Sequence, residues 1–86
     1  MLSRSAEYAI SALKYLAQQP PGQLCGAREI AAETGVPLHY LWKVLKELRD
    51  SKIVRSFKGV KGGYELARPS RRITMRDVLA TVSELL

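Results

Sequence analysis

Residues 27–51 read AREIAAETGVPLHYLWKVLKELRDS, and this stretch decides the fold. Its first part, residues 28–34, is long enough for about two helical turns, and it stops at Gly35 and Pro37, because glycine accepts the positive φ of a helix C-cap and proline suits the first turn of a new helix. After this turn, leucines recur on one stripe that faces a core, at Leu38, Leu41, Leu45 and Leu48. Two helices joined by a tight glycine-containing turn predict a helix-turn-helix over residues 27–51.

The segment directly after these helices predicts a wing. Residues 53–57 alternate in hydrophobicity as a strand does, and residues 64–67 are expected to form the second strand that pairs with them. The glycine-rich residues 58–63 form the loop between the two strands. A basic hairpin of this kind, here residues 53–67, makes the unit a winged helix-turn-helix. The predicted fold class is therefore mainly α with a small β-hairpin, in one domain of residues 1–86.

A helix is expected at each end of the chain. Residues 4–19 contain no Pro or Gly, are followed by Pro20, and are apolar around most of the helix girth. Such a helix is buried on more than one side, either wholly within its own core or against a second copy of the chain, and we favour the second copy. Residues 74–86 begin with Thr74 and Asp77, a weak capping box, and continue as an apolar helical pattern. The expected dimer-interface residues are Tyr8, Leu13, Val82, Leu85 and Leu86.

The net charge of +6 is concentrated in one part of the chain. Residues 1–42 are neutral overall, residues 43–76 carry eleven basic and three acidic residues for a net of +8, and residues 77–86 carry −2. A concentrated basic stretch in a foldable sequence is typical of a polyanion partner, although a solvated face that aids solubility is the alternative. We expect this stretch to form a DNA-facing surface, and DNA rather than RNA because no aromatic stacking platform is evident.

Several other classes of protein are excluded. The single cysteine, Cys25, cannot form an internal disulfide, no apolar run approaches the ~18 residues of a membrane span, and no signal-peptide pattern is present. We therefore expect a cytoplasmic protein without a membrane partner, with Cys25 as a small buried hydrophobic residue. His39 is the only histidine, so a metal site is not expected. No catalytic triad, Cys-His pair, paired carboxylates or nucleotide loop is recognisable, so the chain is not expected to be an enzyme.

The predicted helix-turn-helix and wing place candidate DNA contacts. In such a unit the first two turns of the second helix contact base edges in the major groove, and hairpin residues enter the minor groove, while glycines let the hairpin backbone approach the sugar-phosphate wall. The candidate base-contacting residues are His39, Trp42 and Lys43, with Tyr40 on the flank. Trp42 capping the core is the alternative for that residue. The candidates for phosphates and the minor groove are Arg28, Lys46, Lys58 and Lys61.

Several stretches resemble the Rrf2 family of bacterial transcription regulators. They are residues 2–17, Ile30-Ala31 followed by residues 35–41 (GVPLHYL), Leu45 with Leu48, the wing residues 59–66 (GVKGGYEL), and Ile73-Thr74 leading into Asp77-Val78. The wing and the Ile73–Val78 stretch are the most distinctive of them. The resemblance covers essentially the whole chain. It implies a homodimer on a pseudo-palindromic operator in double-stranded DNA, with residues at the positions of His39, Trp42 and Lys43 in the major groove and Lys58 in the minor groove. The family often has small polar residues, Glu or Gln at these positions, so the operator sequence is not predicted.

The resemblance also implies what this chain lacks. Many family members hold an iron–sulfur cluster with three cysteines in a following segment, and a cluster needs about four protein ligands. Cys25 lies upstream of the helix-turn-helix and the chain stops at Leu86, so no cofactor and no sensing region are expected here. A final helix that runs to two leucines favours a fragment over a short cluster-free member. The alternative function, a winged-helix protein-interaction module without specific DNA binding, is disfavoured by Lys58 and Lys61 in the wing.

Overall fold

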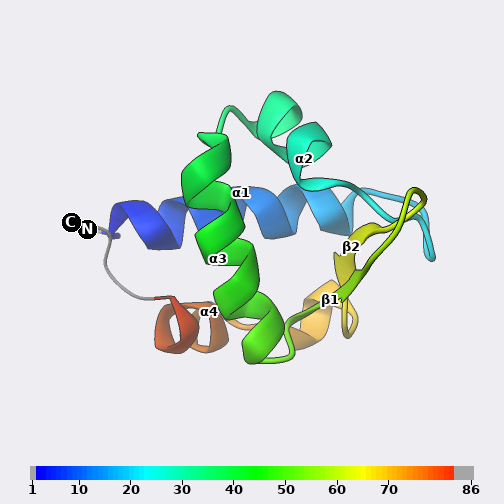
Figure 1. Cartoon of the computed structure of the whole chain (residues 1–86). Helices are drawn as coiled ribbons and strands as arrows, with labels where there is room; N and C mark the ends of the chain where they lie inside the picture. The colour runs from blue at the N-terminus through cyan, green and yellow to red at the C-terminus, as the bar shows by residue number, and fades with distance from the viewer. Residues whose placement is uncertain (1, 83–86) are drawn as a thin grey trace.

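The computed structural model describes residues 2–82 and has the predicted mainly α fold with a small hairpin (Figure 1). The elements are α1 (Arg4–Ala17), α2 (Ala27–Thr34), α3 (Leu38–Asp50), β1 (Val54–Phe57), β2 (Gly63–Leu66), the short 3₁₀ helix η1 (Ser70–Arg72) and α4 (Met75–Thr81). The strands form a two-stranded antiparallel sheet. In the view of Figure 1, α3 crosses in front of α1, with α2 above, α4 below and the hairpin to one side.

The first helix ends two residues before the expected boundary at residue 19. The backbone N–H of Gln18 bonds back to the Tyr15 carbonyl, which tightens the last turn, and Gln18 serves as the C-cap. Pro20 restricts the residue before it to extended conformations, so Gln19 does not continue the helix. The helix is therefore shorter than predicted because Pro20 also restricts the backbone of the residue before it.

Helix α1 is covered mainly by the chain's own elements. It packs against α2, α3, β2 and α4, and its small residues Ala9 and Ala12 have no exposed surface, which lets neighbouring backbones approach closely. Leu13 belongs to this core at 8 % exposure, and the ring of Tyr8 stacks on that of Tyr40 with centroids 5.8 Å apart. The apolar girth of α1 is thus explained within one chain, and the dimer interface stays a prediction.

The turn between α2 and α3 has the geometry that its glycine predicts. Gly35 adopts φ +81 as the C-cap of α2, and its N–H donates to the Ala31 carbonyl at 2.9 Å. The Thr34 hydroxyl donates to the Ile30 carbonyl at 2.6 Å and accepts from the Val36 N–H at 3.2 Å. These bonds satisfy the backbone groups at the turn and fix the direction in which α3 leaves it.

Helix α3 buries one stripe, slightly displaced from the expected one. The four residues with no exposed surface are Leu41, Val44, Leu45 and Leu48. Leu38 is only half-buried, because it stands in the first turn at the edge of the core. Val44 replaces it in the stripe. The opposite side of α3 is thereby left to solvent over its whole length.

The wing is tied to the body of the domain by Cys25. Val54 pairs with Leu66 and Ser56 with Tyr64 across the hairpin. On the other edge of β2, Cys25 and Tyr64 exchange two backbone hydrogen bonds of 3.0 and 2.8 Å. The Cys25 side chain is fully buried, and burial together with the nearby Glu29 carboxylate raises the pKa of its thiol to about 11. The thiol is therefore protonated at neutral pH, as expected for a buried hydrophobic residue.

Helix α4 starts as expected and ends early. The Thr74 hydroxyl accepts from the Asp77 N–H at 3.0 Å, and the Asp77 carboxylate accepts from the Thr74 N–H at 2.9 Å, which completes the predicted capping box. The helix ends at Thr81, and Val82 is extended and half-buried against the core. The helix thus stops at Thr81 and Val82, two β-branched residues that lower helix propensity, and the rest of the expected run, residues 83–86, lies outside the described residues. Leu85 and Leu86 lie outside the described residues.

Removing the N-cap of α4 is expected to destabilise the domain modestly. Thr74→Ala leaves the Asp77 N–H without its acceptor, and the expected loss is about 1 kcal/mol in the free energy of unfolding, measured by urea denaturation. Thr74→Ser is the matched control, because it keeps the accepting oxygen. Equal midpoints for the alanine and serine variants would contradict the role given to this hydroxyl.

The same box predicts a pH dependence of stability. The hydrogen bond from the Thr74 backbone, aided by the Arg68 guanidinium 3.1 Å away, holds the pKa of Asp77 below its ordinary value. A lowered folded-state pKa means that the stabilisation is complete above the unfolded-state pKa of about 3.9 and is lost as the pH falls through the folded value. Asp77→Asn should therefore be less stable than the parent chain at pH 7, and the difference between their free energies of unfolding should decrease below about pH 4. Denaturant midpoints across that pH range measure this difference.

Candidate nucleic-acid interface

The exposed side of α3 carries the candidate base-contacting residues. His39, Lys43 and Lys46 recur on the side opposite the buried leucine stripe, and all three are exposed. In Figure 1 this helix lies in front of α1, so the exposed side faces away from the body of the domain. The buried stripe fixes the helix from behind and leaves these polar side chains free to meet a ligand.

Tyr40 lies on the flank of α3 that faces α1. Its ring stacks on Tyr8, and the ring of His39 lies 4.2 Å from it at a tilt of 39°. Tyr40 is half-buried in this arrangement. The structure therefore engages Tyr40 with neighbouring aromatic rings, and a contact of Tyr40 with DNA stays a prediction.

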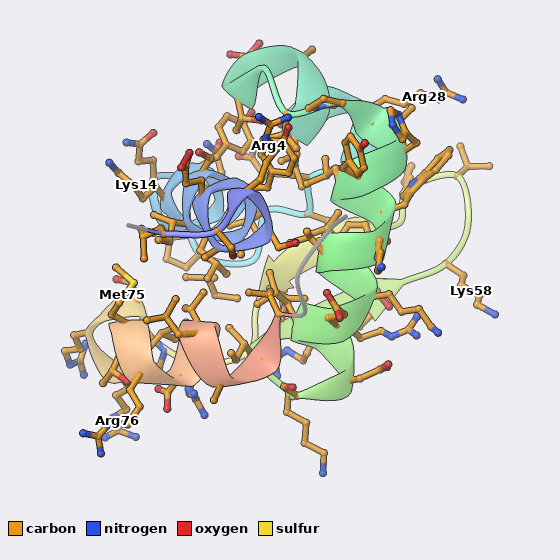
Figure 2. All side chains as sticks on the ribbon, turned by 90° about the vertical axis from the view of Figure 1, so that its left-hand side faces the viewer. Arg4, Lys14, Arg28, Lys58, Met75 and Arg76 are labelled. Carbon is orange, nitrogen blue, oxygen red and sulfur yellow. The ribbon has the colours of Figure 1, made fainter. Side chains whose placement is uncertain are left out.

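A groove of about 710 Å³ runs between the start of α2, the other flank of α3 and the wing. Its lining includes Arg28, Trp42 and Lys58 from the candidate set. The Arg28 guanidinium carbon lies 5.9 Å from the centroid of the Trp42 ring. Figure 2 shows Arg28 and Lys58 projecting on the same side of the molecule. Three segments that are separate in the sequence thus share one concave surface.

The groove also contains residues that the sequence argument missed. Arg49 lines it together with Phe57 and Val60, and the last two are exposed by 48 % and 105 %. Arg49 lies seven residues after Trp42, so helical spacing alone places it on the same flank. Val60 stands between two lysines at the tip of a hairpin, where a large apolar residue has no core to enter. The surface is therefore both basic and apolar.

The basic stretch does not form one surface, contrary to expectation. Arg76 projects on the opposite side of the molecule from Arg28 and Lys58 (Figure 2). The reason is topological, because after the wing the chain returns beneath α1 through η1 and α4. Arg71 and Arg72 belong to η1 on this return path and are exposed. The segment of +8 is therefore divided between the α3–wing side and the η1–α4 side.

Arg49 lies 3.3 Å from the Asp50 carboxylate, and two further arginines of this stretch are also paired within the chain. Arg55 meets Glu65 at 3.0 Å across the two strands of the wing, where the strand register places them opposite each other. Arg68 meets Asp77 at 3.1 Å and links the segment after the wing to the start of α4. Exposed pairs of this kind add little to stability. Their effect here is to reduce the free positive charge of both segments.

Comparison with known proteins identifies the family. The model of the Rrf2 family, described as "Iron-dependent Transcriptional regulator", matches residues 2–86. The chain belongs to the Rrf2 family. This family is one of transcriptional regulators rather than enzymes, in agreement with the sequence argument. Its helix-turn-helix and wing are accordingly those of a DNA-binding regulator family.

Individual relatives of this Rrf2 chain are regulators as well. The putative HTH-type transcriptional regulator Rv1287 of Mycobacterium tuberculosis is 41% identical over 81 residues, which are 94% of this chain and 50% of the relative. The HTH-type transcriptional regulator IscR of Cereibacter sphaeroides is 33% identical over 96% of this chain and 55% of its own length. The chain thus spans about half the length of these relatives.

Solved structures have the same fold. The structure of T. potens IscR matches with a TM-score of 0.88 and 30% identity, over 96% of this chain and 61% of that one. The structure of CymR, the global cysteine regulator of B. subtilis, matches with a TM-score of 0.87 and 25% identity, over 100% of this chain and 71% of that one. The winged helix-turn-helix fold class is therefore confirmed.

The iron named in the family description does not fit the described part of this chain. Within residues 2–82 no group of three His, Cys, Asp or Glu side chains is placed to hold a metal ion. Cys25, the only cysteine of the sequence, is enclosed in the core with a protonated thiol.

No helix among the described residues 2–82 is long and apolar enough to span a membrane.

Proposed function

We propose that this Rrf2 chain is the DNA-reading part of a sequence-specific transcription regulator. It acts in the cytoplasm as a homodimer on a pseudo-palindromic operator, with α3 in the major groove and the wing in the adjacent minor groove, and without a cofactor of its own. The observation that carries this proposal is the exposed side of α3, where His39 and Lys43 face away from the core beside a basic groove that leads to the wing.

The dimensions of DNA support the assignment of α3. The major groove just admits an α-helix, and its base edges distinguish all four base pairs. His39 and Lys43 lie in the first two turns of α3, which is the part of such a helix that meets base edges. Lys46 lies one turn further along, where a phosphate is the nearer partner. Lys58 and Lys61 extend the positive charge along the wing.

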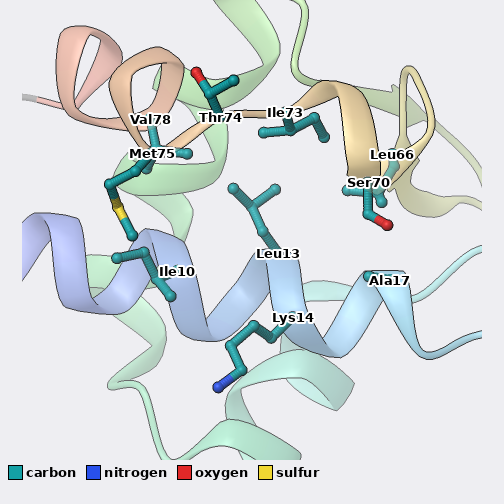
Figure 3. Close-up of a pocket in the computed structure, with 10 residues that line it drawn as sticks. All are labelled: Ile10, Leu13, Lys14, Ala17, Leu66, Ser70, Ile73, Thr74, Met75 and Val78. Carbon is teal, nitrogen blue, oxygen red and sulfur yellow. The ribbon is translucent and has the colours of Figure 1, made fainter.

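The homodimer is proposed on the side of α1 and α4. A pocket of about 180 Å³ lies between these helices, lined mainly by apolar residues, among them Ile10, Leu13 and Val78 (Figure 3). Met75 and Leu79 on α4 are exposed by 50 % and 46 %.

Two lysines of α3 give the proposal its direct test. Operator selection from a randomised duplex library, followed by titration at several salt concentrations, compares Lys43→Ala with Lys46→Ala. Lys43→Ala is expected to change which bases are preferred. Lys46→Ala is expected to weaken all sequences about equally and to reduce the slope of log K against log[salt] by about one.

Other outcomes would separate the candidate functions. An equal loss for all sequences in Lys43→Ala would contradict the placement of α3 in the major groove. Duplex binding by the parent chain that ignores both sequence and salt would contradict specific DNA binding altogether. The parent chain is the reference for both the Lys43→Ala and the Lys46→Ala measurements.

A further inference from the structure

Arg28 and Trp42 belong to different helices and meet at the edge of the groove beside the wing. Arg28 stands in the first turn of α2, and Trp42 in the second turn of α3. The guanidinium carbon lies 5.9 Å from the centroid of the indole ring. Both residues line the groove, and both are exposed. Neither side chain is needed to fill the core.

This geometry is that of a cation–π contact. The face of an indole ring is electronegative, and a guanidinium within about 6 Å of its centroid is attracted to it. Stacking engages the face of the guanidinium and leaves the N–H donors in its plane, which are the groups that bind a phosphate in a two-pronged manner. A ring beneath Arg28 also removes part of the rotamer freedom that would otherwise be lost on binding.

The position of Trp42 on α3 fits a supporting role. The centre of the exposed side is occupied by His39, Lys43 and Lys46, and Trp42 lies on the flank toward α2 and the wing. Its exposure of 48 % is too large for a residue that caps the core. The ring is therefore placed to hold Arg28 between the helix that reads bases and the helix that precedes it.

We infer that Trp42 is a positioning residue that holds the Arg28 guanidinium toward a DNA backbone phosphate, rather than a reader of bases. The inference rests on the proposed DNA-binding function. It couples Arg28 and Trp42, so that Trp42 contributes to operator affinity only through Arg28. Trp42 then contributes nothing to the choice of bases.

A double-mutant cycle on operator affinity tests this coupling in the 86-residue chain. Trp42→Ala is expected to weaken operator binding about twofold to fivefold when Arg28 is present, and to have no further effect in an Arg28→Ala background. Trp42→Phe keeps an aromatic face and should retain most of the affinity. Circular dichroism melting of each variant verifies that it is folded. The same fold-loss in both Arg28 backgrounds would overturn the inference.

Fluorescence supplies a readout that needs no DNA. Trp42 is the only tryptophan, so its emission and its quenching by acrylamide report on this ring alone. Arg28→Ala should increase the acrylamide quenching of Trp42 in the free chain, and Arg28→Lys should do so less. Unchanged quenching in Arg28→Ala would overturn the pair even in a chain that binds DNA specifically. If Arg28→Ala increases the quenching of Trp42 as expected but the parent chain selects no operator, the proposed function is overturned, and with it the phosphate role of Arg28.

Discussion

Gly63→Ala is expected to lower the free energy of unfolding by about 2–5 kcal/mol, a large part of the stability of a domain this size. Gly63 has φ +149, a conformation that residues with a side chain rarely adopt. A Cβ at this position would also lie 2.8 Å from the backbone carbonyl carbon and oxygen of Cys25. Because both obstacles are backbone, relief requires β2 to move away from Cys25, which breaks the two hydrogen bonds that tie the wing to the domain.

Gly62→Ala is expected to have an effect of similar size for a different reason. A Cβ on Gly62 would stand 2.0 Å from the Phe57 carbonyl oxygen, which is impossible without opening the hairpin loop. The N–H of Gly62 donates to the Gly59 carbonyl at 3.0 Å within the same turn. From the sequence alone, we expect these glycines to let the hairpin backbone approach DNA closely. The structure shows that Gly62 and Gly63 are already required by the fold itself, because a side chain at either position would clash with the chain's own backbone.

Gly26→Ala is the matched control for both glycine variants. Gly26 has an ordinary φ of −73, and nothing lies within 4 Å of a Cβ placed there. Gly26 is the N-cap of α2, where glycine is preferred to alanine, so its substitution should lower the free energy of unfolding only modestly, by less than about 1 kcal/mol. Midpoints for Gly62→Ala and Gly63→Ala that match the one for Gly26→Ala would contradict the close packing of the wing against Cys25.

The sequence was sufficient where a local pattern determines the outcome. Gly35 and Pro37 place the turn between α2 and α3, because positive φ and a missing N–H act within a few residues. The leucine stripe of α3 follows from helical spacing, and the capping box of α4 from Thr74 and Asp77. Each of these features depends on neighbours in the chain rather than on the tertiary arrangement.

The sequence was insufficient where distant segments meet. It does not show which surface covers α1, and the chain's own helices supply most of that cover. A linear count of charge placed Arg76 with Lys58, although the chain reverses between them (Figure 2). The contact of Arg28 with Trp42 joins two helices across the turn, and periodicity within either helix cannot reveal it.

Reversing two charges on the α3–wing side is expected to remove most of the affinity for the operator. Each phosphate contact reduces log K by about 0.9 per decade of salt, so at 0.1 M one contact is worth about eightfold relative to 1 M. The double variant Lys46→Glu with Lys58→Glu loses the phosphate contact of Lys46 and the positive charge that Lys58 brings to the minor groove, and it adds repulsion. We expect a loss on the order of 100-fold or more at 0.1 M salt, and a salt slope reduced by about two.

The opposite side of the domain offers a control of equal charge. Lys14→Glu with Arg76→Glu lowers the net charge of +6 by the same four units, and both residues project away from the side of Arg28 and Lys58 (Figure 2). The domain is 20 Å across even in its shortest dimension, whereas the screening length at 0.1 M salt is about 10 Å. This variant should therefore lose less than about threefold in affinity.

Fluorescence anisotropy with a labelled operator measures both variants, at equal dimer content verified by light scattering. The light-scattering measurement is needed because Lys14 lines the pocket between α1 and α4 where the dimer is proposed. If both double variants lose the same affinity, then the binding follows the net charge of the chain and no particular side of the domain faces DNA. A loss confined to Lys46→Glu with Lys58→Glu would instead assign the phosphate contacts to the α3–wing side, because net charge is identical in the two proteins.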